Sequence, residues 1–172
     1  MEEDTDLENR PLFHITETDG WRVDHRANSA LPGYLIISSK SFVTDLSDLA
    51  ESTLCELGPL LAASQDALKR KLDAQRVYIG RYGHAPGRTL HFHVIPIYEW
   101  IEELFWQDSR YRVLEEFAEG KGETSVDGAE LTLFVWREFC ERAEPPPIRG
   151  PSVLQAIALL RDALDHRQTG RS

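Results

Sequence analysis

The stretch TLHFHVIP, residues 89–96, constrains the fold more than any other part of the chain. Polar and apolar side chains alternate over its first five residues, and this is the period of a strand, because successive strand side chains point to opposite faces. His91 and His93 are therefore expected on one face, with Thr89 one step before them. The strand rise separates the two imidazoles by about 7 Å along the chain. The stretch predicts a strand that carries a compact polar site on an apolar frame.

Other segments with strand periodicity predict an α+β domain built on an antiparallel sheet of about five strands. A long helix over residues 46–74 is expected on one face of this sheet, since its leucines recur at helical spacing. Pro59 lies inside that helix and predicts a kink or a break. Asp19-Gly20 predicts a hairpin turn between the first two strands. The strands predicted outside the histidine stretch are Phe13–Glu17, Trp21–His25, Tyr34–Ile37 and Val77–Arg81.

The second half of the chain is mainly helical in pattern. Helices are predicted over Trp100–Glu119, residues 128–142 and Ser152–Asp165, with a strand as the alternative for the second because Leu131, Leu133 and Val135 alternate. The prolines at 145–147 predict a stiff linker. The expected organisation is a disordered acidic tail at 1–9, a domain at 10–119 and a helical C-terminal extension at 120–172.

Composition excludes several classes of function. The formal net charge of −10 argues against binding to a nucleic-acid polymer or to an anionic membrane, because both need a positive surface. Two cysteines without a CxxC motif make a disulfide scaffold or a structural zinc site unexpected. No apolar run is long enough to span a bilayer, and the acidic N-terminus is unlike a signal peptide. A cytoplasmic location is expected.

Three interpretations of the two histidines compete. They could be structural, or they could bind zinc with a third ligand such as His84, His25 or a carboxylate, although no spacing specifies that ligand. The third interpretation is nucleophilic catalysis, since a neutral imidazole attacks phosphorus readily and a second histidine can donate a hydrogen bond to a phosphoryl oxygen. Arg88, next to the strand, could then neutralise charge on those oxygens.

Two blocks of sequence resemble the histidine triad superfamily. Residues 90–96, LHFHVIP, resemble its His-φ-His-φ-His-φ-φ signature, where φ is apolar, and a proline often closes that signature. Residues 31–37, LPGYLII, resemble its first block, an apolar strand entered through Pro-Gly. A long predicted helix and a strand separate the two blocks, as in the family. The resemblance covers roughly residues 12–106.

The resemblance implies roles for individual residues. Aligned on Pro96, His93 matches the third histidine and His91 the middle one, which attacks the α-phosphate in the family and forms a nucleotidyl-enzyme intermediate. Thr89 takes the place of the first histidine and is expected to keep an orienting role, and His84 is a conceivable substitute. The run Ser38–Ser41 also lacks the histidine that members often carry there.

The family binds the ribose through an Asp or Asn at the end of the strand before the Pro-Gly loop. Asp24 is the candidate here, and His25, Arg26 and Asn28 are alternatives because the loop length leaves the register open.

The resemblance thus implies hydrolysis or transfer at the α-phosphate of a dinucleoside polyphosphate or a nucleoside phosphoramidate. It implies a homodimer and no required cofactor, although a divalent cation could neutralise a polyphosphate. Two alternatives remain open: a nucleotide-binding or interaction protein with weak catalysis, and a metalloenzyme with histidine ligands.

Overall fold

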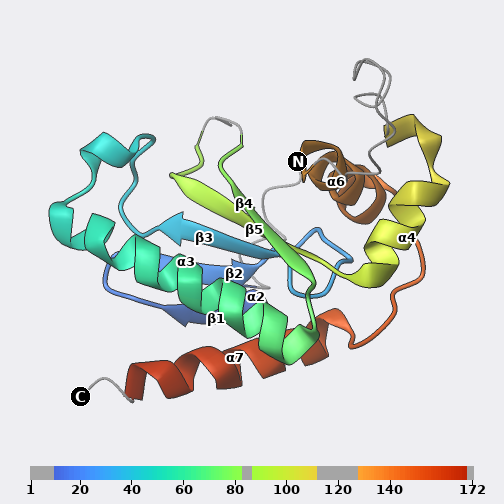
Figure 1. Cartoon of the computed structure of the whole chain (residues 1–172). Helices are drawn as coiled ribbons and strands as arrows, with labels where there is room; N and C mark the ends of the chain where they lie inside the picture. The colour runs from blue at the N-terminus through green and yellow to red at the C-terminus, as the bar shows by residue number, and fades with distance from the viewer. Residues whose placement is uncertain (1–9, 83–86, 112–127, 170–172) are drawn as a thin grey trace.

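The structure is a computed structural model that describes residues 10–82, 87–111 and 128–169 (Figure 1). Its centre is a five-stranded sheet with strand order β1-β2-β3-β5-β4, and every neighbouring pair is antiparallel. The predicted α+β class and the antiparallel sheet are confirmed. The strands are β1 (His14–Glu17), β2 (Trp21–His25), β3 (Leu35–Ser39), β4 (Arg76–Gly80) and β5 (His91–Ile97).

Helices flank the sheet and connect its strands. The longest of them, α3 (Glu51–Leu72), joins β3 to β4 and continues through Pro59, so the predicted break does not occur. The others are α2 (Arg10–Phe13), α4 (Glu99–Gln107), α6 (Gly128–Trp136) and α7 (Val153–Thr169), with short turns η1 (Leu46–Asp48) and η2 (Ser109–Tyr111) and a π-helical turn η3 (Arg137–Glu141).

The register of the strands decides which side chains share a face. Val23 pairs with Ile37 and Ile37 pairs with Phe92, so these three apolar residues lie on one face. Trp21 lies on the same face of β2 and donates its indole N–H to the Thr53 carbonyl of α3 at 2.8 Å. The apolar face of the sheet is therefore the face that α3 covers, and the side chains of His91 and His93 point to the opposite face.

The hairpin between β1 and β2 turns where the sequence predicted. The Thr18 N–H donates to the Trp21 carbonyl at 2.8 Å across Asp19-Gly20. The turn lies so close to α3 that a Cβ on Gly20 would be 2.5 Å from the Thr53 side chain. A side chain at this position would force Thr53 to move, so close packing favours glycine.

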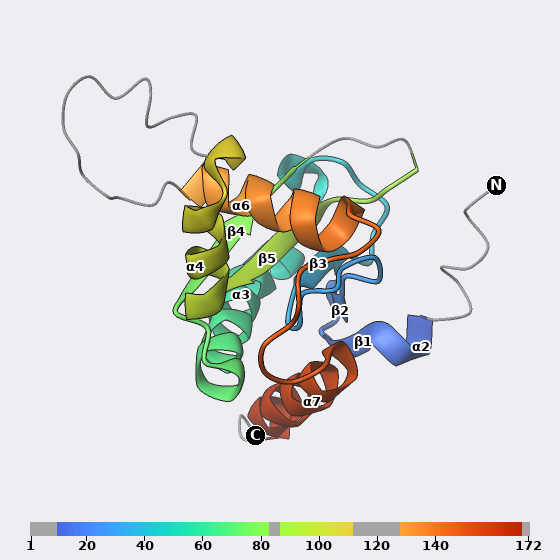
Figure 2. The same cartoon turned by 90° about the vertical axis from the view of Figure 1, so that its right-hand side faces the viewer.

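The C-terminal helices belong to the same core as the sheet. Buried residues of α6, η3 and α7 join one hydrophobic cluster with the strands, among them Leu131, Phe134, Phe139, Ile157 and Leu160. Figures 1 and 2 show α7 below the sheet, alongside α3 and β1, and α6 above it. The segment predicted as an extension is thus packed into the domain, while the predicted tail at 1–9 and part of the 120–172 segment lie outside the described residues.

Several predicted boundaries shift. The helix predicted over Trp100–Glu119 is seen as α4, which ends at Gln107, and residues 112–127 lie outside the described part. The helix predicted for residues 128–142 is confirmed over the strand alternative, and its last turn is π-helical. Thr89 precedes β5 and is not part of it. In the part of the chain that the structure describes, no helix is both long and apolar enough to cross a bilayer.

Candidate active site

The candidate site begins at the end of the β2–β3 ladder. The Arg26 N–H donates to the Tyr34 carbonyl at 2.8 Å, so these residues continue the pairing one step beyond His25 and Leu35. Tyr34 is two residues before Ile36, and Ile36 pairs with His93. Because side chains alternate along a strand, Arg26 and Tyr34 lie on the same face as His93.

The Pro-Gly loop fixes the start of β3 and therefore the position of Tyr34. Gly33 has a φ of +80°, and a Cβ there would be 2.7 Å from Leu72 and 2.9 Å from Leu68. The Tyr98 hydroxyl donates to the Pro32 carbonyl at 2.8 Å. Only glycine combines this backbone conformation with so close an approach to α3.

Arg26 connects Tyr34 to α6. Its guanidinium donates through Nη1 to the Tyr34 hydroxyl at 2.9 Å and through Nε to the Asn28 side-chain oxygen at 2.8 Å. The guanidinium carbon lies 4.2 Å from the centre of the Trp136 ring and 5.1 Å from that of the Tyr34 ring. Stacking on two aromatic faces favours a guanidinium over an ammonium at this place.

His93 is buried, with only 4% of its surface exposed. Its Nδ1 lies 3.0 Å from the Tyr34 hydroxyl oxygen, and its ring centre lies 5.3 Å from that of Tyr82 and 5.8 Å from that of Trp136. Burial lowers the pKa of His93 to about 4, and the positive charge of Arg26 adds to this effect. His93 is therefore neutral near pH 7.

His91 is half-buried, and its ring centre lies 5.2 Å from that of His93. Its Nδ1 lies 2.8 Å from the backbone carbonyl of Thr89. A carbonyl only accepts hydrogen bonds, so Nδ1 must carry the proton of the neutral ring and Nε2 keeps its lone pair. Within the described residues Nε2 has no hydrogen-bond partner, and it is therefore available as a nucleophile.

Comparison with known proteins identifies solved structures with a similar fold. No protein-family model and no curated protein sequence matches the chain. Among solved structures, a zinc-bound histidine triad family protein from Mycobacterium smegmatis matches with a TM-score of 0.54 and 14% identity, over 96% of this chain and 92% of that one. A hypothetical histidine triad nucleotide-binding protein from Sulfolobus tokodaii strain 7 gives a TM-score of 0.50 and 15% identity, over 95% and 91%.

The chain has the histidine-triad fold. A uridylyltransferase mutant also matches, with a TM-score of 0.57 and 15% identity over 94% of this chain, but this chain spans only 46% of that protein. The likeness to the Mycobacterium smegmatis protein extends over 96% of this chain, so it includes C-terminal helices that the sequence resemblance did not reach.

Within the histidine-triad fold, the Thr89 side chain contacts a neighbouring loop and not the imidazoles. Its hydroxyl donates to the Ser41 carbonyl at 2.7 Å and accepts from the Val43 N–H at 3.3 Å. The residue still orients His91, but it does so through its backbone carbonyl. Arg88 is exposed, and its charge contributes to the lowered pKa of His93, so it lies within electrostatic range of that ring. Its role toward a phosphate stays a prediction.

The other predicted residues lie away from the two imidazoles. Asp24 is in register with Ile36 and His93 on the same face, but two strands away, about 10 Å at the usual strand spacing. Its carboxylate accepts hydrogen bonds from Arg22 and His14 at 2.9 and 3.1 Å.

His25 is on the face that α3 covers, where its ring nitrogens contact the carbonyls of Arg26 and Leu31 at 3.0 and 3.1 Å. Burial lowers its pKa to about 4. The structure therefore does not bring His25 to the site. His84 lies outside the described residues.

The sequence analysis missed Tyr34, Tyr82 and Trp136 as site residues, and it considered Arg26 only for the ribose. Two signals were present: Tyr34 directly follows the Pro-Gly pair, and Arg26 directly follows the preceding strand. Either could have been placed on the histidine face from the alternation of side chains. Trp136 carried no such signal, because it comes from a helix whose packing the sequence does not specify.

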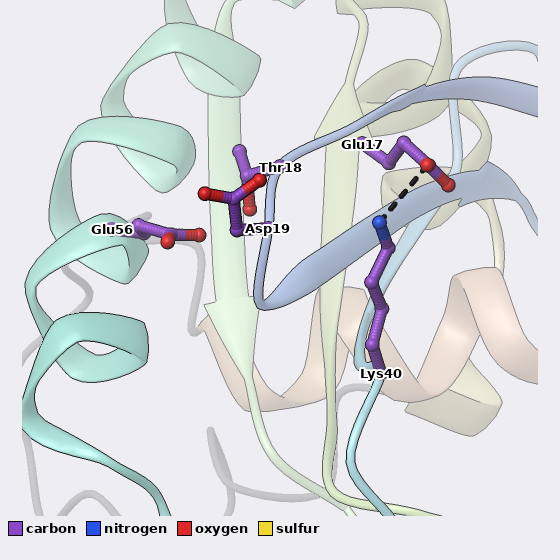
Figure 3. Close-up of a pocket in the computed structure, with 5 residues that line it drawn as sticks. All are labelled: Glu17, Thr18, Asp19, Lys40 and Glu56. Carbon is purple, nitrogen blue, oxygen red and sulfur yellow. Dashed lines mark ion pairs between the residues drawn. The ribbon is translucent and has the colours of Figure 1, made fainter.

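Two further features of the described residues bear on ligands. No group of three or more His, Cys, Asp or Glu side chains is arranged there to hold a metal ion. A hollow of about 500 Å³ lies at the β1–β2 turn (Figure 3), and its lining carries three carboxylates but one ammonium group, in an ion pair of 2.9 Å with Glu17. This negative lining does not suit a phosphate group. The lining residues are Glu17, Thr18, Asp19, Lys40 and Glu56.

Proposed function

We propose that this protein is a nucleotide hydrolase or transferase that acts at the α-phosphate through a covalent intermediate on His91. Candidate substrates are a dinucleoside polyphosphate and a nucleoside phosphoramidate. The observation that carries the proposal is the hydrogen bond of His91. Its Nδ1 donates to the Thr89 carbonyl, which leaves the lone pair of Nε2 accessible beside a second imidazole, that of His93. A held, neutral imidazole is a nucleophile suited to phosphorus.

The reaction balances without a cofactor. Nε2 of His91 attacks the α-phosphorus, an N–P bond forms, and the bond from phosphorus to the leaving oxygen or nitrogen breaks with its electron pair going to the leaving group. Water, or another acceptor hydroxyl, then attacks the same phosphorus, and the N–P bond breaks with its electron pair returning to Nε2 of His91. The proton of the attacking O–H passes to the leaving group or to solvent, and the nucleotide is released. His93 would donate to a phosphoryl oxygen, and the exposed Arg88 would neutralise developing charge.

The nucleoside would extend along the histidine face toward β2. Asp24 remains the proposed ribose contact, since it lies in register with His93 two strands away. No group in this scheme requires a metal ion, although a divalent cation bound to a polyphosphate would add to the charge neutralisation.

Trapping of the intermediate tests the proposal. The protein is mixed with a dinucleoside polyphosphate radiolabelled at the α-phosphate, quenched in alkali and separated by gel electrophoresis. We expect an adduct that is stable in alkali, is lost in acid and is absent in His91→Ala. Glu103→Ala, which changes an exposed residue of α4, should keep it.

The alternatives give different results. Nucleotide binding by calorimetry, with neither adduct nor turnover for polyphosphate and phosphoramidate substrates, would favour a binding protein. Stoichiometric zinc that is lost on changing His91 or His93, with activity following the metal, would favour a metalloenzyme.

We also propose a homodimer, because β4 is an edge strand whose outer side has no partner strand in the described part of the chain.

A further inference from the structure

We propose that Arg26 and Tyr34 form a one-way hydrogen-bond relay that fixes His93 as the tautomer with its proton on Nε2. The two histidines of the strand then have opposite tautomers, with a lone pair on Nε2 of His91 and an N–H on Nε2 of His93. Arg26 and Tyr34 are positioning residues in this scheme. Their effect on catalysis rests on the proposed function, but the tautomer itself does not.

The direction of the relay follows from the donors and acceptors. Arg26 donates through Nη1 to the Tyr34 hydroxyl oxygen at 2.9 Å, and a guanidinium has no acceptor and does not lose its proton. The Tyr34 oxygen is thus an acceptor toward Arg26. Its own O–H is free to donate to Nδ1 of His93, which lies 3.0 Å away. An Nδ1 that accepts this hydrogen bond is unprotonated, so a neutral His93 carries its proton on Nε2.

The reverse arrangement leaves a buried donor without an acceptor. If Nδ1 of His93 donated to Tyr34, the phenolic proton would have to point elsewhere. Tyr34 is 0% exposed, and among the described residues its hydroxyl has hydrogen-bond contacts only with Arg26 and His93. A buried O–H without an acceptor is costly, and this cost selects the direction from Arg26 through Tyr34 to His93.

Three features keep the relay in this state near neutral pH. Burial raises the pKa of Tyr34 to about 12, so the phenol retains its proton. Burial and the charge of Arg26 lower the pKa of His93, so the ring stays neutral and carries one proton. The Trp136 ring, 4.2 Å from the guanidinium carbon, holds Arg26 in place.

As a result, the two histidine side chains have different chemical roles. His91 donates its Nδ1 proton to the Thr89 carbonyl and therefore presents a lone pair. His93 accepts at Nδ1 and presents an Nε2–H, which has no hydrogen-bond acceptor among the described residues. Such an N–H can bind a phosphoryl oxygen but cannot attack phosphorus, so only one of two rings 5.2 Å apart is the nucleophile.

Nuclear magnetic resonance of the substrate-free protein tests the tautomers directly. Protein labelled with ¹⁵N-histidine is recorded at pH 7 with long-range ¹H–¹⁵N correlation. We expect protonated Nε2 and unprotonated Nδ1 for His93, with the reverse pattern for His91. A protonated Nδ1 on His93 in the wild-type protein would overturn the proposal, and this result needs no variant.

Variants separate the relay from general packing. Tyr34→Phe keeps the ring but removes the hydroxyl, and should give a mixed or reversed His93 tautomer with His91 unchanged. Arg26→Lys keeps a donor and should retain the wild-type pattern more fully than Arg26→Met. Unchanged His93 shifts in folded Tyr34→Phe would refute the relay. If adduct formation occurs, Tyr34→Phe should slow it about tenfold with little change in KM, whereas absence of any adduct refutes the proposed function and leaves the tautomer result standing.

Discussion

Replacing Glu138 by alanine should destabilise the protein more than the loss of an exposed ion-pair carboxylate would. Glu138 lies in η3, and its carboxylate is only 5% exposed. It accepts hydrogen bonds from Tyr111 at 2.7 Å, Arg110 at 3.0 Å and Arg142 at 2.6 Å. The carboxylate therefore joins η2, the short turn after α4, to η3.

The expected loss can be worked from these contacts. The Tyr111 bond to a buried charged acceptor contributes about 1.5 kcal/mol. The two arginine side chains are 67% and 54% exposed, so water replaces most of what they lose, and only the i,i+4 partner Arg142 adds to the sum, by about 0.5 kcal/mol. The total predicts a loss of about 2 kcal/mol for Glu138→Ala. Glu138→Gln keeps the shape and one acceptor, and should cost about 1 kcal/mol.

Urea unfolding followed by circular dichroism measures these differences, with Glu103→Ala as the matched control. Glu103 also pairs with an arginine, Arg149, at 2.6 Å, but it is 49% exposed and should cost about 0.5 kcal/mol or less. Equal losses in Glu138→Ala and Glu103→Ala would refute the argument that burial makes the first carboxylate important.

The pH dependence of the same variants gives a second check. Burial raises the pKa of Glu138, but its bonds to Tyr111 and Arg142 and the charge of Arg110 outweigh this, so the net pKa is lowered. A lowered folded-state pKa stabilises the protein above the unfolded pKa, and the effect is lost as pH falls through the folded value. The wild-type advantage over Glu138→Gln should therefore shrink below about pH 4.

Three further predictions concern the site and the assembly. His93 and His25 have pKa values lowered from 6.5 to about 4, so between these pH values the unfolded chain binds more protons than the folded one. Stability should therefore decrease as pH is lowered from 6.5 to 4, by about 3 kcal/mol at most for each histidine. The urea midpoint of His93→Gln should depend less on pH. Thr89→Val should lose about 1 kcal/mol in the same assay while His91 keeps its Nδ1 proton, since the backbone carbonyl remains. If β4 forms the dimer, Ile79→Lys should elute as a monomer in size-exclusion chromatography, whereas Leu154→Lys on α7 should not.

The parts of the fold that the sequence predicted are those that local physics decides. The alternation around His91 specified a strand and its polar face, and Asp19-Gly20 specified a turn, because both signals act within a few residues. The start of β3 followed from the Pro-Gly pair for the same reason.

The candidate site was predicted only in part, because its remaining contacts are tertiary. The hydrogen bond from Tyr34 to His93 and the stacking of Arg26 on Trp136 join distant segments, and no local pattern encodes them. Thr89 shows the same limit. An orienting role was expected of it, and the structure gives it a contact with His91 through the backbone carbonyl, while its hydroxyl holds the segment at Ser41 and Val43.

The placement of Trp136 over Arg26 has a consequence for the order in which the site is completed during synthesis. The five strands are complete at Ile97, before α6 has been made. A nascent chain from which β5 has emerged and α6 has not holds both imidazoles but lacks the Trp136 ring, so His93 would meet water and titrate closer to 6.5. Arg26 would likewise lack the Trp136 ring, one of the two rings on which it stacks. In the nascent sheet the His93 ring would thus be more basic than in the complete fold, and the difference between the two rings would develop only when α6 packs.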